Sequence, residues 1–216
     1  GSIGRRHLRV LREISSDFEI SVLRSGLGKP CAEADVANQI FTELSDALLW
    51  KPQAAIICTP ASDHLNKALP LARLAVPLLI EKPIGTGHER PSDWQELIGL
   101  SKIVPIGIAY VLRHDPCVAY ISNMLNEGRL GTLIDADFYC GTWLPDWRPG
   151  VDYRETVSAK TALGGGVLLE LSHELDMAKF LFGDIQLESS MLMNSGLLEI
   201  DKEGQEILIG QGGPNI

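Results

Sequence analysis

Hydrophobic positions in the first half of the chain form short apolar runs that alternate with stretches of helical periodicity. Runs of four to six residues have the length of buried strands, whereas apolar residues spaced three or four apart predict amphipathic helices. The predicted strands are 18–24, 54–58, 77–80 and 104–109; the predicted helices are 3–14, 64–75 and 94–101, with short helical or irregular pieces over 32–41 and 44–50. Because strands that alternate with helices form βαβ units, residues 1–112 are predicted to form an α/β domain with a doubly wound parallel sheet.

After residue 112 the pattern changes to a helix followed mainly by strands. The predicted helices are 116–126 and 171–181; the predicted strands are 133–140, 187–193, 197–200 and 206–209, with a hairpin turn at 202–204. Residues 113–216 are therefore predicted to form a second, sheet-rich domain. The chain stops without an obvious final sheet element, so we expect this domain to be incomplete.

Charge, hydropathy and cysteine content limit the kinds of partner and ligand that this chain is predicted to bind. The 216 residues carry a formal net charge of −9, whereas a nucleic-acid-binding protein needs a basic surface, so no nucleic-acid partner is predicted. The most apolar stretch, 68–80, is interrupted by an arginine and two prolines, and no membrane span is predicted. The four cysteines are far apart and form no C-x-x-C pair, which predicts no metal site and reduced thiols in a cytoplasmic protein.

The first residues of the chain predict a nucleotide-binding loop. Gly1 and Gly4 have the spacing of the last two glycines of G-x-G-x-x-G. Gly1 would let the backbone approach a pyrophosphate, Gly4 would let the helix pack closely, and the free amides at the helix start, including Ser2 and Ile3, would face the phosphates. No strand or first glycine precedes Gly1, so the first strand of this Rossmann-type sheet is predicted to be missing. Two glycines in an ordinary loop are the alternative interpretation.

The residues that would read the cofactor's ribose favour NADP(H). In this type of fold the ribose is read about 20 residues after the glycine loop, and here that position is occupied by Arg24 and Ser25. A carboxylate there would bind the ribose hydroxyl of NAD, whereas an arginine pairs with the 2′-phosphate of NADP. NADP(H) is therefore the favoured cofactor and NAD(H) the second possibility, with a solvated arginine at a strand end as the alternative.

Four motifs in a fixed order make the prediction more specific: G-S-I-G-R-R-H, C-T-P-A-S-D-H, E-K-P and G-G-G-V-L-L-E-L-S-H-E-L-D. With them the chain resembles the glucose–fructose oxidoreductase / inositol dehydrogenase (Gfo/Idh/MocA) family over residues 1–183. The resemblance implies hydride transfer between a nicotinamide cofactor and a hydroxyl or keto carbon of a sugar, amino sugar or cyclitol derivative. It also implies a second domain with an open, mainly antiparallel sheet that binds the substrate and assembles homo-oligomers. The family positions that would line the cofactor are Thr59, Pro60, His64, Glu81 and Lys82.

The same resemblance indicates the catalytic residues. Lys82 would lie at the carboxyl end of a strand, where an ammonium can polarise the substrate oxygen. His173 is the predicted general base, because a histidine accepts a proton near neutral pH. Glu170 and Asp176 are the predicted orienting carboxylates, although the family has an Asp four residues before its His and here Glu170 lies three before. A surface role for Lys82, and helix capping or metal binding by His173, are the alternatives.

Several further residues are predicted to contact the ligands. A proline-rich loop from 143 to 154 combines aromatic rings, which suit sugar faces, with arginines, which suit a carboxylate or phosphate. The predicted substrate-binding residues are Tyr110, Trp143, Trp147, Arg148, Arg154 and Lys160, and Arg113 is predicted to border the nicotinamide pocket. The tryptophans could instead pack over the second domain.

Two other functions are compatible with these motifs. The fold could serve a non-catalytic binding or regulatory protein, because fold does not determine chemistry, or the chain could be an inactive truncated fragment of an enzyme. The presence of both Lys82 and His173 favours the NAD(P)-dependent oxidoreductase.

Overall fold

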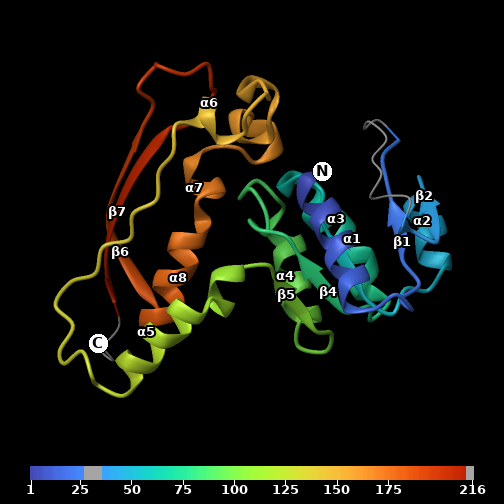
Figure 1. The fold of residues 1–216 in the computed structure, drawn as a ribbon, viewed down its shortest axis with the longest axis horizontal. Coiled ribbons are helices and arrows are strands. Elements are labelled where there is room, and N and C mark those ends of the chain that lie inside the picture. Colours follow the sequence, from blue (N-terminus) through green and yellow to red (C-terminus); the bar gives the residue numbers. More distant parts are fainter. Residues whose placement is uncertain (27–35, 213–216) are drawn as a thin grey trace. The chain divides into compact units, whose positions relative to one another are not determined.

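The structure is a computed structural model that describes residues 1–26 and 36–212 (Figure 1). The chain divides into two compact units. The first comprises residues 1–59 and 63–108, and the second comprises residues 60–62 and the chain from 109 onward.

The first unit contains two parallel sheets with helices between their strands. One sheet pairs β1 with β2, and the other has the order β3-β4-β5, in which Ile57, Ile80 and Ile108 are neighbours in register. The elements are α1 (Ser2–Ile14), β1 (Ser21–Leu23), β2 (Gln39–Phe41), α2 (Leu44–Leu49), β3 (Ala55–Ile57), α3 (His64–Arg73), β4 (Leu78–Ile80), α4 (Pro91–Leu100) and β5 (Ile106–Ile108). The alternation of parallel strands with helices confirms the α/β class predicted for this part of the chain.

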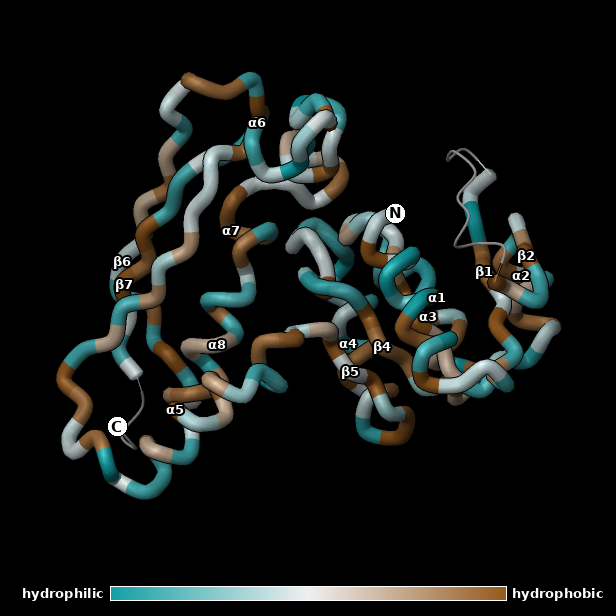
Figure 2. Tube along the Cα trace, in the orientation of Figure 1, coloured by the Kyte–Doolittle hydropathy of each residue, from teal (hydrophilic) through white to brown (hydrophobic). Residues whose placement is uncertain are grey.

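The core of the first unit lies between the three-stranded sheet and the packed helices α3 and α4. Ile80 of β4 and Ala68 of α3 are completely buried, and Leu97 contributes from α4. Apolar residues of α3 recur at helical spacing and give it a buried face, so packing of that face, rather than helix propensity, holds α3 in place. The strand β4 is brown in Figure 2, as expected for a strand buried on both faces.

The stretch 32–41 contains a strand that the sequence pattern did not indicate. Gln39–Phe41 forms β2, which pairs in parallel with β1 through Ser21 and Gln39. Three residues are too short for a period to be recognised, and their extended conformation comes from pairing with β1. Residues 27–35, which include Cys31 and the predicted strand-ending Gly28, lie outside the described residues.

The second unit combines helices with one antiparallel sheet. β6 (Ile185–Met193) pairs with β7 (Gln205–Gly212), and α5 (Pro116–Asn126) has the predicted bounds. Asp115 caps α5 by accepting hydrogen bonds from the amides of Cys117 and Val118. The other elements are η3 (Val111–His114), α6 (Leu144–Trp147), η4 (Tyr153–Glu155), η5 (Val157–Ala159), η6 (Thr161–Leu163), α7 (Val167–Glu170) and α8 (Ser172–Phe182).

Two predicted strands of this unit and its tight hairpin turn are wrong. Residues 133–140 form no strand, and Ile134 is 96% exposed. Residues 197–200 belong to the connection between β6 and β7, where Leu197 is 75% exposed and the side chain of Asn194 donates to the carbonyl of Lys202. That connection runs over 194–204, so 202–204 is not a tight turn. Neither segment has a partner strand among the described residues that would stabilise an extended conformation.

Candidate cofactor and active site

The start of α1 has the properties of an anion-binding site. Gly1 is the N-cap of this 13-residue helix, no acidic residue lies in its first turn, and the space that a Cβ at Gly1 would occupy is open. The unpaired amides and the helix dipole therefore favour a phosphate at this end, next to the first helical residues Ser2 and Ile3. A Cβ at Gly4 would stand 3.4 Å from the Cβ of Cys58, which places α1 against the turn that follows β3. These residues fit the pyrophosphate of a dinucleotide.

Arg24 and Ser25 directly follow β1. The amide of Arg24 donates to the carbonyl of Phe41 at 2.9 Å, which extends the pairing with β2 by one residue. Both residues therefore stand at the carboxyl end of their sheet, where open α/β sheets bind ligands.

His64, predicted to line the cofactor, lies in the interior of the first unit. Its ring is 1% exposed, with Nδ1 2.9 Å from the carbonyl oxygen of Pro83 and Nε2 2.9 Å from that of Thr59. A neutral imidazole can donate to only one of these carbonyl oxygens, so the ring donates to one of the two turns and packs against the other. Pro60, in the same motif, is exposed.

The turn after β4 carries Glu81 and Lys82. Glu81 is 9% exposed, and its Oε1 lies 2.7 Å from Nε2 of His7 on α1, while its Oε2 accepts a hydrogen bond from the amide of Lys82 at 3.3 Å. The Lys82–Pro83 peptide bond is cis, and the Lys82 side chain is half-buried at the carboxyl end of the strand. The structure thus places Lys82 where the sequence predicted it and gives Glu81 a partner within the protein.

Cys58 lies close to Glu81 of this turn, and its thiol is expected not to react as a nucleophile. Burial, together with the nearby charge of Glu81, raises the pKa of its thiol to about 12, so the nucleophilic thiolate is absent near neutral pH. We expect iodoacetamide at pH 8 to alkylate the exposed Cys117 of the folded protein and to reach Cys58 only in denaturant, as read by peptide mass spectrometry. Labelling of both cysteines at equal rates would contradict this.

In the second unit, His173 contacts Tyr110. The two rings pack edge to face with centroids 5.7 Å apart, so a residue predicted to contact substrate adjoins the predicted base. One turn further along α8, Asp176 accepts two hydrogen bonds from Arg113, at 2.6 and 2.8 Å. This pairing raises the pKa of Arg113, whose guanidinium also lies over the ring of Phe180.

Asp176 and Arg113, both predicted site residues, pair with each other. Both carboxylate oxygens of Asp176 are engaged by the guanidinium, and the Asp176 side chain is 9% exposed. The pair therefore joins α8 to η3. The bidentate geometry makes this one of the stronger polar contacts of the unit.

Glu170 does not share a continuous helix with His173. The chain breaks at Leu171, with φ −99° and ψ 28°, so that α7 ends at Glu170 and α8 begins at Ser172. Glu170 and His173 therefore lie on two separate helical segments. Upstream of α7, a Cβ at Gly165 would stand only 2.4 Å from the carbonyl oxygen of Val157, which explains the glycine at this position.

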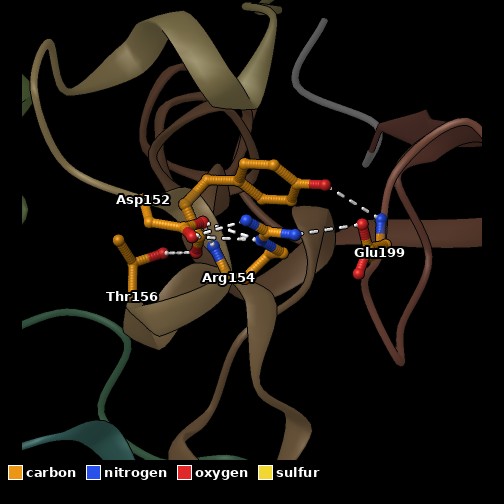
Figure 3. A network of polar contacts seen from close by, with 5 residues as sticks. Asp152, Arg154, Thr156 and Glu199 are labelled. Atoms are coloured by element: carbon orange, nitrogen blue, oxygen red, sulfur yellow. Dashed lines mark hydrogen bonds and ion pairs between the residues drawn. The ribbon is translucent and has the colours of Figure 1, made fainter.

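The arginine predicted to bind an acidic group on the substrate is already neutralised. Arg154 pairs with Asp152 at 2.7 Å and with Glu199 at 3.2 Å, and these carboxylates raise its pKa (Figure 3). The neighbouring Tyr153 hydroxyl accepts a hydrogen bond from the amide of Glu199, which ties η4 to the β6–β7 connection. The guanidinium thus has two carboxylate partners within the second unit.

The remaining predicted substrate residues stay at the surface of the second unit. Trp143 is 50% exposed and Trp147 37% exposed, with the guanidinium of Arg148 5.7 Å from the centroid of the Trp147 ring. Lys160 is exposed as well. Trp143, Trp147 and Arg148 are therefore accessible to a ligand, and their predicted role in substrate binding stays a prediction.

The part of the chain that the structure describes contains no group of three or more His, Cys, Asp or Glu side chains able to hold a metal ion. Among residues 1–26 and 36–212, no helix combines the length and apolar character needed to cross a bilayer.

The sequence prediction missed the partner of Glu81. His7 was part of the G-S-I-G-R-R-H motif but received no role, because nothing in the local pattern relates it to a residue 74 positions away.

Comparison with known proteins agrees with this architecture. Residues 1–102 match the model of the GFO_IDH_MocA family, described as an oxidoreductase family with an NAD-binding Rossmann fold. A search of curated protein sequences found no match.

Three similar solved structures are sugar or polyol dehydrogenases. The WlbA dehydrogenase from Bordetella pertussis, in complex with NADH and UDP-GlcNAcA, is 18% identical with a TM-score of 0.78, over 98% of this chain and 64% of that chain. A levoglucosan dehydrogenase in complex with NADH and levoglucosan is 17% identical (TM-score 0.71; 97% and 61%). Myo-inositol 2-dehydrogenase from Lactobacillus plantarum is 15% identical (TM-score 0.71; 91% and 58%).

At these identities the structures establish the fold, and the chain spans 58–64% of their lengths. A Rossmann domain with a parallel sheet is followed by a second domain with an antiparallel sheet, as the sequence predicted. Over residues 1–102, which form its NAD-binding Rossmann domain, the chain matches the Gfo/Idh/MocA oxidoreductase family.

Proposed function

We propose that this protein is an NAD(P)-dependent dehydrogenase or reductase that acts on a hydroxyl or keto carbon of a sugar, amino sugar or cyclitol derivative. The observation that carries this function is the position of Lys82 directly after β4, in the unit whose helix α1 begins with an open anion-binding end. The solved relatives that hold NADH together with a sugar ligand support this substrate class.

Each residue of the proposed machinery has a defined task. The amides at the start of α1 hold the dinucleotide phosphates, and the bound nicotinamide supplies the hydride acceptor or donor. Lys82 donates a hydrogen bond to the substrate oxygen and stabilises the negative charge that develops on it. His173 removes the hydroxyl proton, and the edge of its ring against Tyr110 restricts the ring's orientation. Trp143 and Trp147 offer aromatic surface to the sugar.

A non-catalytic binding protein with this fold is the second candidate, favoured by the internal pairing of Asp176, Arg154 and Glu81. A direct assay separates the two candidates. The protein is titrated with NADH and NADPH by fluorescence and then offered a panel of polyols and nucleotide sugars with the oxidised cofactors. Reduction of the cofactor by one member supports the dehydrogenase, whereas cofactor binding with no turnover of any member favours the binding protein.

Arg24 is proposed to select NADP(H). Its cationic side chain follows β1 at the predicted ribose-reading position, although two of the solved relatives named above hold NADH. We expect Arg24→Asp to reverse or erase a preference for NADPH in fluorescence titrations, because a carboxylate repels the 2′-phosphate and accepts from the ribose hydroxyl. Arg129→Asp, an equal charge change on an exposed arginine of the second unit, is the control. Equal affinity of the parent protein for NADPH and NADH would refute this role.

The sheet of the second unit is proposed to assemble homo-oligomers. Met191 and Ile207 are cross-strand partners, 53% and 52% exposed, and Ile209 beside them is 54% exposed. Such an apolar strip on a sheet face favours association. Light scattering after gel filtration should show an oligomer for the parent protein and a monomer for Met191→Lys combined with Ile207→Lys. Leu197→Lys, on an equally apolar but non-strand residue, should leave the assembly intact, and a monomeric parent would refute this surface.

A further inference from the structure

A hydrogen bond in the first unit joins the glycine-loop helix to the turn that carries Lys82. His7 lies on the second turn of α1, and Glu81 follows β4; their side chains meet at 2.7 Å between Nε2 and Oε1. Because an ionised carboxylate only accepts hydrogen bonds, His7 is the donor. The other oxygen of Glu81 accepts from the amide of Lys82 at 3.3 Å. The carboxylate therefore contacts the helix and the backbone of Lys82 at once.

Because Glu81 is buried, its carboxylate depends on this hydrogen bond. Its side chain is 11% exposed and that of His7 21%, so the pair is largely shielded from solvent. The neighbouring Cys58 thiol does not replace the lost hydration of the carboxylate. Burial and the charge of Glu81 raise the pKa of this thiol, so it stays neutral. A buried carboxylate is stable only when hydrogen bonds replace its lost hydration. Removing the His7 donor leaves the buried Oε1 without this hydrogen bond and is expected to drive the turn toward water.

A second histidine holds the other side of the same turn. Nδ1 of His64 lies 2.9 Å from the carbonyl oxygen of Pro83, and its Nε2 lies 2.9 Å from that of Thr59, with the ring 1% exposed. Lys82 therefore lies between two residues that are each anchored by a histidine. The anchors reach different elements, α1 on one side and the turn after β3 on the other.

We propose that His7, acting through Glu81, is a positioning residue that fixes Lys82 relative to the phosphate-binding end of α1, with His64 as the complementary anchor through Pro83. This role rests on the proposed dehydrogenase function. Lys82 acts on the substrate, whereas His7 acts on the placement of Lys82. The contact fixes the position of Lys82 relative to α1, the helix proposed to bind the dinucleotide. Hydride transfer between two bound molecules requires such a fixed arrangement.

The kinetic test compares His7→Ala and His7→Gln with the parent protein. His7→Ala should lower kcat by roughly 10- to 100-fold, the scale expected when a reacting group is misplaced by about 1 Å, while NADH and NADPH affinities measured by fluorescence change little. His7→Gln keeps an N–H donor near the position of Nε2 and should restore most of kcat. His88→Ala, an exposed histidine of the same unit, is the control and should match the parent.

Two measurements do not depend on turnover. A double-mutant cycle of His7→Ala and Glu81→Gln in chemical unfolding should be non-additive, because the two side chains act through one contact. Hydrogen exchange of a peptide spanning 79–84 should be faster in His7→Ala than in the parent and slow again in His7→Gln.

Each outcome decides the role of His7. Parent-like kcat for His7→Ala, additive unfolding energies or unchanged exchange at 79–84 would overturn it, as would a variant that loses cofactor affinity while keeping kcat at saturation. If His7→Ala does not fold, His7→Gln carries the test, and a large loss of kcat in that variant would also overturn it. A parent protein that turns over no substrate in the panel refutes the dehydrogenase function, whereas the unfolding cycle and the exchange data still decide whether His7 holds the turn.

Discussion

Replacing His173 with alanine is expected to lower kcat by about 10²–10⁴-fold, the usual contribution of a positioned general base. A hydroxyl that loses hydride while keeping its proton would give a protonated carbonyl, so removing the base raises the barrier to the chemical step. Cofactor affinity should barely change, because His173 belongs to the second unit and the proposed phosphate-binding residues to the first. Single-turnover reduction of the nicotinamide, followed by stopped-flow absorbance in parent and variant, measures the effect directly.

The pH profile of kcat and two further variants make this test more specific. If His173 is the base, the acidic limb of the kcat profile reports its protonation in the bound enzyme and should disappear in His173→Ala. His114→Ala, an exposed histidine of the same unit, should behave like the parent. Tyr110→Phe keeps the edge-to-face packing on His173 but removes the hydroxyl, and a modest effect is expected. A parent-like rate for His173→Ala would move the role to Tyr110 or Glu170.

Replacing Lys82 with methionine should be at least as damaging. Removing one donor that stabilises a developing oxyanion typically costs about 10²–10³-fold in kcat, and the ammonium adds a full charge to that interaction. Methionine keeps most of the length and apolar volume of the side chain, so the loss reports the charge and the hydrogen bond and not a cavity. The expected result is a large fall in kcat with little change in NADPH or NADH affinity, measured with the same stopped-flow and titration protocols.

Two further variants separate charge from placement at this position. Lys82→Arg retains the positive charge in a planar group of different reach and should recover only part of the activity. Lys102→Met, at an exposed lysine of the same unit, should leave kcat unchanged. A Lys82→Met protein with parent-like kcat would show that the lysine neither polarises nor positions the substrate.

Local sequence pattern determined much of the first unit and part of the second. The apolar runs at 54–58, 77–80 and 104–109 contain β3, β4 and β5, and apolar residues at helical spacing indicated α1 and α3. Pro116 and Gly128 bracket α5, whose predicted bounds match the structure. Such signals are readable because burial of one face or two imposes a period on neighbouring residues. The order of the four motifs likewise identified the family without any contact being known.

Only the tertiary structure determined which residues of the candidate site contact one another. The three-residue strand β2 exists because β1 pairs with it, and exposed Ile134 and Leu197 form no strand because no neighbour does. Glu199, one of the two partners of Arg154, lies 45 residues away, and His7, the partner of Glu81, lies 74 residues away, so local pattern could not indicate either contact. The sequence specified which chemical groups the site contains. Folding determined which of those groups satisfy one another, because hydrogen-bond and charge pairing depend on distance in space and not along the chain.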